Sequence, residues 1–137
     1  MITEDYVSFE TAKLLKEKGF DEYTLAYYDE TGIFEYDPDF LPNGLLCPTF
    51  CSAPTLGKTM KWLREMHNIH IGDNITYTEN PEKFPPKYYV YVSDTKTGDT
   101  LIKKECCLAQ KNLTPKSFDS PEEACEAAIK YCLENLI

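Results

Sequence analysis

Residues 88–106, which read YYVYVSDTKTGDTLIKKEC, decide the fold. Two valines alternate with tyrosines over residues 89–92, and this period of two is typical of a β-strand with one buried face. Residues 94–99 are rich in Asp, Thr and Gly, which favours a turn. The segments 88–93 and 100–106 are therefore predicted to form a β-hairpin.

A second hairpin is predicted nearer the N-terminus. Residues 23–28 and 33–36 are rich in aromatic and β-branched side chains, which suit a pleated, half-buried surface. The sequence DETG at 29–32 lies between them, and its glycine can supply the positive φ that a tight loop requires.

Helical periodicity identifies three further segments, 8–18, 55–68 and 120–136. Ser8 can cap the first helix, and Gly19 can end it in the left-handed conformation. The last helix opens with SPEE, a capping box with proline in the first turn, and Pro54 is assigned to the first turn of the middle helix. The expected buried stripes are Phe9, Ala12 and Leu15 in the first helix, then Leu56, Met60, Leu63 and His67, widened by Trp62 and Met66, and finally Cys125, Ala128, Ile129, Cys132 and Leu136.

The remaining segments complete the predicted order. A strand is expected over 69–77 with an interruption at 72–74, and the proline-containing stretch 37–53 is expected to be a long irregular connection. The order is α-β-β-α-β-β-β-α, with hairpins in place of βαβ units. This order predicts an α+β fold, an antiparallel sheet with helices packed on it, and residues 1–137 have the size of a single domain.

The formal charge of −9 is concentrated in one part of the chain. Residues 1–39 carry 11 Asp and Glu and 3 Lys, for a net charge of −8, and residues 40–137 carry only −1. Such an acidic surface repels phosphate backbones and favours basic partners, so general nucleic-acid binding is disfavoured.

The composition also bears on the cellular compartment. The acidic start of the chain does not resemble an export signal, and no run of about 18 apolar residues suggests a membrane span. We therefore expect a cytoplasmic protein without a membrane partner. In a reducing compartment the six cysteines are expected to serve packing, metal binding or thiol chemistry, and disulfides are not expected.

Three stretches carry a resemblance to a known group of proteins. They are TAKLLKEKGF at 11–20, the segment 51–69 containing APT and KWLRE, and the C-terminal segment 120–137. Together they resemble a family of small uncharacterised proteins from gut-bacterial genomes and their prophages or other mobile elements. That family has no assigned catalytic residues, so the resemblance implies a cytosolic, phage-related protein and no site residue.

Cys47, Cys51, His67 and His70 are the candidate metal ligands. Their types suit zinc, but 15 residues separate the two pairs and two residues separate the histidines, unlike the spacing of zinc fingers. A thiol enzyme would need one of these histidines as base for Cys51. A helix of this length carries His67 about 20 Å from its start, which is too far from Cys51 for a hydrogen bond, so such an enzyme is disfavoured. Alternation sends the adjacent Cys106 and Cys107 to opposite faces of a strand. No cofactor is expected.

Lys58, Lys61 and Arg64 recur every third residue on the middle helix and are the candidate anion-contacting surface. From residue 55 onward the order helix, three strands, helix echoes double-stranded RNA-binding domains, which rely on basic contacts to phosphates. Lys103 and Lys104 are the other basic residues available. The same stripe is also what an ordinary solvated helix face looks like.

Eighteen aromatic residues are too many for so small a core, so some are expected at an interface. The candidates are Tyr27, Tyr28, Tyr89 and Tyr91. These observations favour a non-enzymatic protein-interaction or accessory factor that binds a protein partner or itself. The alternatives are a nucleic-acid-binding module that uses the helix over 55–68, and a cysteine- or metal-dependent enzyme.

Overall fold

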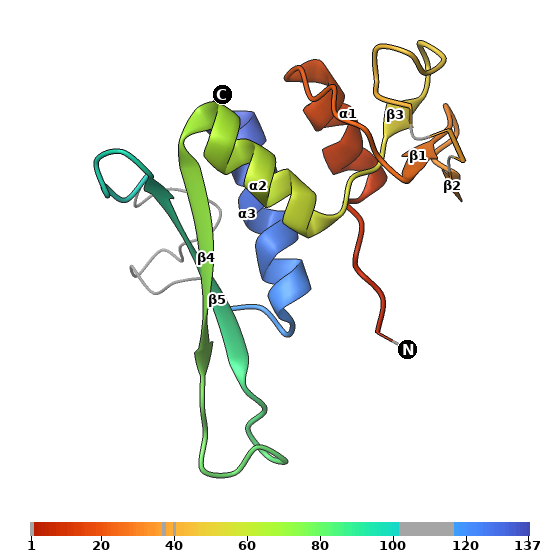
Figure 1. Ribbon diagram of the computed structural model, residues 1–137. Helices are drawn as coiled ribbons and strands as arrows, with labels where there is room; N and C mark the ends of the chain where they lie inside the picture. The colour runs from red at the N-terminus through yellow and green to blue at the C-terminus, as the bar shows by residue number, and fades with distance from the viewer. Residues whose placement is uncertain (1, 37, 40, 102–116) are drawn as a thin grey trace.

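The computed structural model describes residues 2–36, 38, 39, 41–101 and 117–137 (Figure 1). Its elements in chain order are α1 (Phe9–Glu17), β1 (Ala26–Tyr28), β2 (Phe34–Tyr36), β3 (Cys51–Ser52), α2 (Leu56–His67), β4 (Ile69–Thr76), β5 (Lys87–Asp94) and α3 (Pro121–Asn135). The strand pairs among these residues are antiparallel, which confirms the predicted α+β class.

Within the described residues the strands form two sheets, where the sequence suggested one. The first sheet has the order β2-β1-β3, and the second is the β4-β5 hairpin. Strand β3 arises within the stretch expected to be irregular and pairs with β1. The predicted strand over 100–106 lies mostly outside the described residues, but Leu101 N donates to Val92 O at 2.8 Å, so the chain turns back along β5 as expected.

Two of the helices begin and end as the sequence predicts. Ser8 Oγ accepts a hydrogen bond from Thr11 N at 3.3 Å at the start of α1. Gly19 has φ +91°, which only glycine adopts readily, and there the chain leaves the helix. Ser120 Oγ accepts from Glu123 N at 3.1 Å at the start of α3.

Helix α2 differs from its prediction in two respects. Its N-cap is Thr55, whose Oγ1 accepts a hydrogen bond from Lys58 N at 3.2 Å. Pro54 therefore precedes the cap and lies outside the first turn. Met66 was expected in the buried stripe and is 63% exposed. The chain reverses at Asn68, in the left-handed conformation, and the buried Ile69 of β4 occupies the core at that end of the helix.

The β4–β5 ladder is continuous from Ile69 opposite Asp94 to Thr76 opposite Lys87, so the interruption predicted at 72–74 is wrong. Glycine usually weakens a strand because it presents no side chain to pack. Here the ring of Tyr91 on the facing strand lies so close to Gly72 that a β-carbon would be 2.0 Å from its Cζ. The tyrosine therefore covers the glycine, and pairing continues through it.

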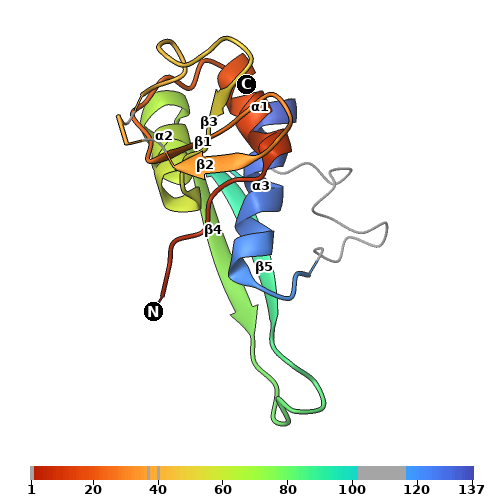
Figure 2. The ribbon, with the colours of Figure 1, turned by 90° about the vertical axis from the view of Figure 1, so that its right-hand side faces the viewer.

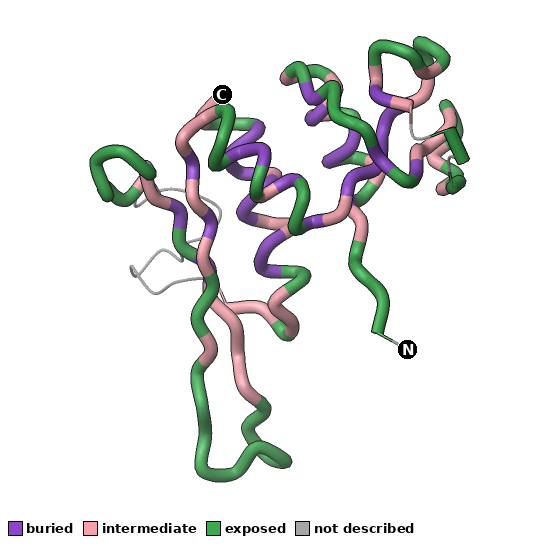
Figure 3. The backbone as a smooth tube through the Cα atoms, in the orientation of Figure 1, coloured by how far each residue is buried: buried purple, intermediate pink, exposed green. Residues whose placement is uncertain are grey.

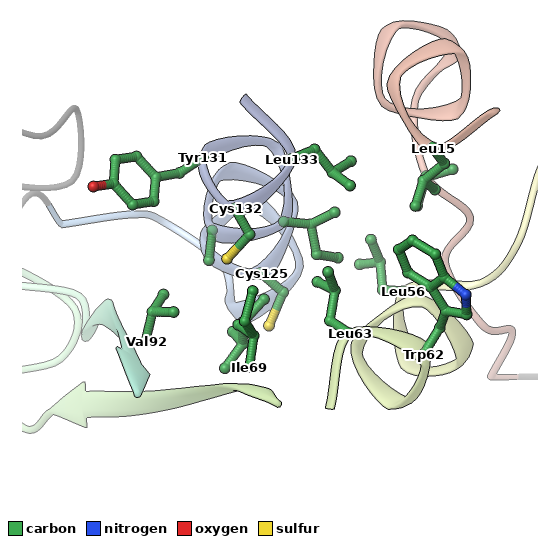
Figure 4. Packing of buried hydrophobic residues seen from close by; sticks show 14 of the residues in the cluster. Leu15, Leu56, Trp62, Leu63, Ile69, Val92, Cys125, Tyr131, Cys132 and Leu133 are labelled. Atoms are coloured by element: carbon green, nitrogen blue, oxygen red, sulfur yellow. The ribbon is translucent and has the colours of Figure 1, made fainter. Parts of the chain in front are cut away.

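Alternation along the hairpin places Ile69, Ile71, Val90 and Val92 on one face, where they are buried in the core. Figure 4 shows Ile69 and Val92 packed with side chains of the helices. One hydrophobic cluster joins side chains from all three helices and both sheets. Buried residues lie in the half of the molecule that contains the helices, whereas the far end of the β4–β5 hairpin is exposed (Figure 3). Within the described ranges, no helix is both long and apolar enough to cross a membrane.

Candidate functional site: an acidic groove where three helices begin

The N-terminal segment brings the starts of all three helices together. Leu56 N, at the start of α2, donates to Asp5 O at 2.9 Å, and Val7 N donates to Pro54 O at 3.0 Å. Residues 5–7 thus run antiparallel to residues 54–56, with Tyr6 paired to Thr55. The first turns of α1 and α3 face this segment, and a groove lies between them.

The groove has a volume of about 620 Å³ and two kinds of lining. Its apolar side chains are Tyr6, Leu56, Phe118 and Ala127. Its charged side chains are Asp5, Glu10, Glu122, Glu123, Glu126 and Lys130. A neighbouring hollow of about 250 Å³ shares three of these residues and extends to Met60 and Cys125.

Some of these carboxylates hold the fold together. Glu126 Oε1 accepts hydrogen bonds from Ser8 N at 3.0 Å and from the buried Thr11 Oγ1 at 2.6 Å, which joins α3 to the start of α1. Glu10 Oε2 lies 3.0 Å from Lys130 Nζ, and the hydrogen bond from that lysine lowers the pKa of Glu10. Lys130 is therefore already paired within the groove.

Asp5, Glu122 and Glu123 leave exposed negative charge along the groove. The two glutamates lie in the first turn of α3, where the helix dipole stabilises carboxylates. With the carboxylates that are already bonded, the groove holds five acidic side chains against one lysine. Such a surface attracts ammonium and guanidinium groups, and its apolar part can contact aliphatic side chains.

The predicted anion-contacting residues Lys58, Lys61 and Arg64 are exposed on α2, as expected. Lys58 Nζ donates to a backbone carbonyl, and Lys61 Nζ lies 3.9 Å from Glu65 Oε1. The hollow beside these lysines is also lined by Glu22 and Glu65. The stripe exists, but carboxylates border it and weaken its attraction for an anion.

The four candidate metal ligands are not brought together. Cys51 begins β3 and Cys47 precedes it, whereas His67 and His70 flank the junction of α2 and β4 on the opposite side of the molecule (Figure 1). His67 instead packs edge-on against Trp62, with ring centroids 4.7 Å apart. In the part of the chain that the structure describes, no three metal-ligating side chains cluster.

The described cysteines differ in accessibility. Cys47 is exposed, and hydrogen bonding to the Thr49 side chain lowers its pKa. Burial raises the pKa of Cys51, which lies far from both histidines that could act as its base. Cys106 and Cys107, like Lys103 and Lys104, lie outside the described residues.

The four candidate interface tyrosines have different environments. The hydroxyl of Tyr28 donates to Val7 O at 2.6 Å, so this residue supports the fold. Tyr27 stacks on Phe50, with ring centroids 5.3 Å apart and planes 8° apart. Tyr89 is half-buried, and Tyr91 is 41% exposed beside Gly72, which leaves Tyr91 the most accessible of the four.

The acidic groove was not among the sites predicted from sequence. Its signals were present separately, as the acidic N-terminal third and the Glu122–Glu123 pair of the capping box, but only folding brings residues 5–10 against 118–130. No protein-family model, curated protein or solved structure matches the chain.

Proposed function

We propose that this chain is a non-enzymatic protein-interaction factor, and that its acidic groove binds a basic, amphipathic segment of a partner protein. The observation that carries the proposal is the combination, in one groove, of apolar side chains with five carboxylates. Apolar contacts supply affinity, and complementary charge supplies partner selection and a faster association rate.

The volume of the groove supports this proposal. At about 620 Å³ it can receive several side chains of a peptide, because ligand sites generally occupy some 300–1,000 Å³. Tyr6 and Phe118, which are partly exposed, offer an apolar surface for aliphatic groups, while Glu122 and Glu123 can pair with lysine or arginine at the rim. A helix with apolar and basic faces matches this arrangement.

The charge of the groove disfavours the nucleic-acid alternative. A nucleic acid would need a positive surface, and the available stripe on α2 is bordered by Glu22 and Glu65. The enzyme alternative has less support, since Cys51 and the two histidines lie on opposite sides of the molecule.

The resemblance to proteins of prophages and other mobile elements favours an accessory factor as the kind of interaction protein. Such a factor acts by occupying a partner, and a basic segment on a host or phage protein is the class of target that the groove fits. We propose the cytoplasm as its compartment, in keeping with the four described cysteines, none of which forms a disulfide.

A peptide titration tests the proposal. The probe is a fluorescein-labelled amphipathic helix with leucines on one face and lysines on the other, followed by anisotropy. We expect binding at low ionic strength that weakens as salt is added, because salt screens exposed charges. Two further peptides, with lysine replaced by glutamate or leucine replaced by serine, should bind much more weakly.

Matched variants locate the binding surface. Glu122→Gln/Glu123→Gln removes two charges from the groove and should weaken binding by about tenfold. Glu79→Gln/Glu82→Gln removes two exposed charges from the β4–β5 loop and should leave binding unchanged. Absence of binding to the basic peptide, or an equal loss in both double variants, would contradict the proposal.

A further inference from the structure

The β4–β5 hairpin forms an arm, residues 74–89, whose end projects beyond the helices. Both views show its tip extending past the start of α3 (Figures 1 and 2). The base of the arm is anchored, because Tyr88 and Phe118 exchange backbone hydrogen bonds at 2.9 and 2.8 Å, and Lys87 forms an ion pair with Asp119. The arm is thus held in a defined direction.

The tip of the arm is ordered by its own hydrogen bonds. Phe84 N donates to Asn80 O at 2.8 Å, Lys83 N donates to Asn80 Oδ1 at 3.2 Å, and Thr78 Oγ1 donates to Phe84 O. Three prolines in the loop restrict the backbone further. Even so, Tyr77 is 81% exposed and Phe84 is 57% exposed. An ordered loop that presents aromatic rings loses little entropy when it binds, as in a docking element.

The charge of the arm indicates what it can dock against. Residues 74–89 contain two acidic and two basic side chains, for a formal net charge of zero, so the −9 of the chain lies entirely outside them. Two copies of this protein repel each other elsewhere through their acidic surfaces. Their arms can approach without that repulsion, and each offers acids, a lysine and exposed aromatic rings to the other.

We propose that the arm is a self-association surface, and that a second copy of this chain docks on it through the same arm. In a two-fold arrangement Tyr77 and Phe84 of one copy pack on the same residues of the other, and Lys83 faces Glu79 or Glu82 across the contact. None of the side chains proposed to form this contact lines the groove, although Phe118, which anchors the arm, does, so the contact can fail without the proposed function failing.

Sedimentation velocity over micromolar to millimolar concentrations measures this association. We expect a reversible monomer–dimer equilibrium that Tyr77→Ala/Phe84→Ala weakens by about tenfold or more, since aromatic anchors dominate small interfaces. Circular dichroism and thermal melting should show that this variant remains folded, because both side chains are largely exposed. A protein that stays monomeric throughout, or a dimer that the double variant does not weaken, would overturn the proposal.

Charge exchange then tests the facing arms. Lys83→Glu should weaken the dimer about tenfold, whereas Lys96→Glu, an exposed lysine at another turn with the same change in net charge, should not. Glu79→Lys/Glu82→Lys alone should also weaken it, and mixing it with Lys83→Glu should restore association as a heterodimer. Equal effects of Lys83→Glu and Lys96→Glu, or no recovery on mixing, would show that association depends on overall charge and overturn the facing-arm geometry.

Discussion

Ser52 in β3 shows how a single buried side chain can cost stability. It is fully buried, and within the described part of the chain its Oγ has no hydrogen-bond partner. Desolvating a hydroxyl without a partner costs about 1–3 kcal/mol. We therefore expect Ser52→Ala to raise the free energy of unfolding by about 1 kcal/mol, as measured by urea denaturation. A loss of more than about 1 kcal/mol would show that the hydroxyl is bonded after all.

At the scale of elements, the capping of α3 is the interaction most easily tested. Ser120 Oγ accepts the hydrogen bond from Glu123 N, one of the donors left unsatisfied at a helix start. Ser120→Ala should lower the free energy of unfolding by about 1 kcal/mol, and Ser120→Asp, which keeps an acceptor at the cap, should restore most of it. Equal stability of the alanine and aspartate variants in urea denaturation would contradict this role.

At the scale of the whole molecule, buried thiols make the core sensitive to high pH. Burial raises the pKa of Cys125 to about 11 and that of Cys132 to about 12, from an ordinary 9.0. Their contribution to stability is complete below pH 9, where both states hold the proton. It is lost as pH rises above 9, because the two thiols then release their protons in the unfolded chain while burial keeps them protonated in the folded chain.

Urea denaturation at pH 8 and pH 10 measures this loss. The free energy of unfolding should fall at pH 10, and Cys125→Ala/Cys132→Ala should show a smaller fall, although it is less stable at both pH values because it leaves cavities. Tyrosines and lysines also lose protons in this pH range, but they are the same in both proteins. The difference between the two falls in the free energy of unfolding therefore reports on the thiols alone. An equal fall in the free energy of unfolding in both proteins would mean that these thiols do not contribute to the pH dependence of stability.

Local signals in the chain determined most of the elements. Ser8, Gly19 and the SPEE sequence at 120–123 act on neighbouring backbone groups, so the limits of α1 and α3 follow from a few adjacent residues. Alternation in the same way placed Val90 and Val92 on the buried face of β5.

Local signals did not predict strand pairing or burial correctly where a residue outside the element determines them. The glycine at 72 looked like a break, but Tyr91 on the facing strand covers it. Met66 fitted the helical stripe, but the reversal at Asn68 lets Ile69 occupy the core. In both cases the deciding contact belongs to another strand or turn, so a helical or strand period could not reveal it.

The sequence by itself therefore determined the class of fold, the capped helices and the acidity of the N-terminal third. Only the tertiary structure decided which carboxylates share a groove, by hydrogen-bonding residues 5–7 to 54–56 and Glu126 to the start of α1. The physical reason is separation along the chain: Ser8 and Glu126 lie 118 residues apart, and no local pattern reports contacts at that distance.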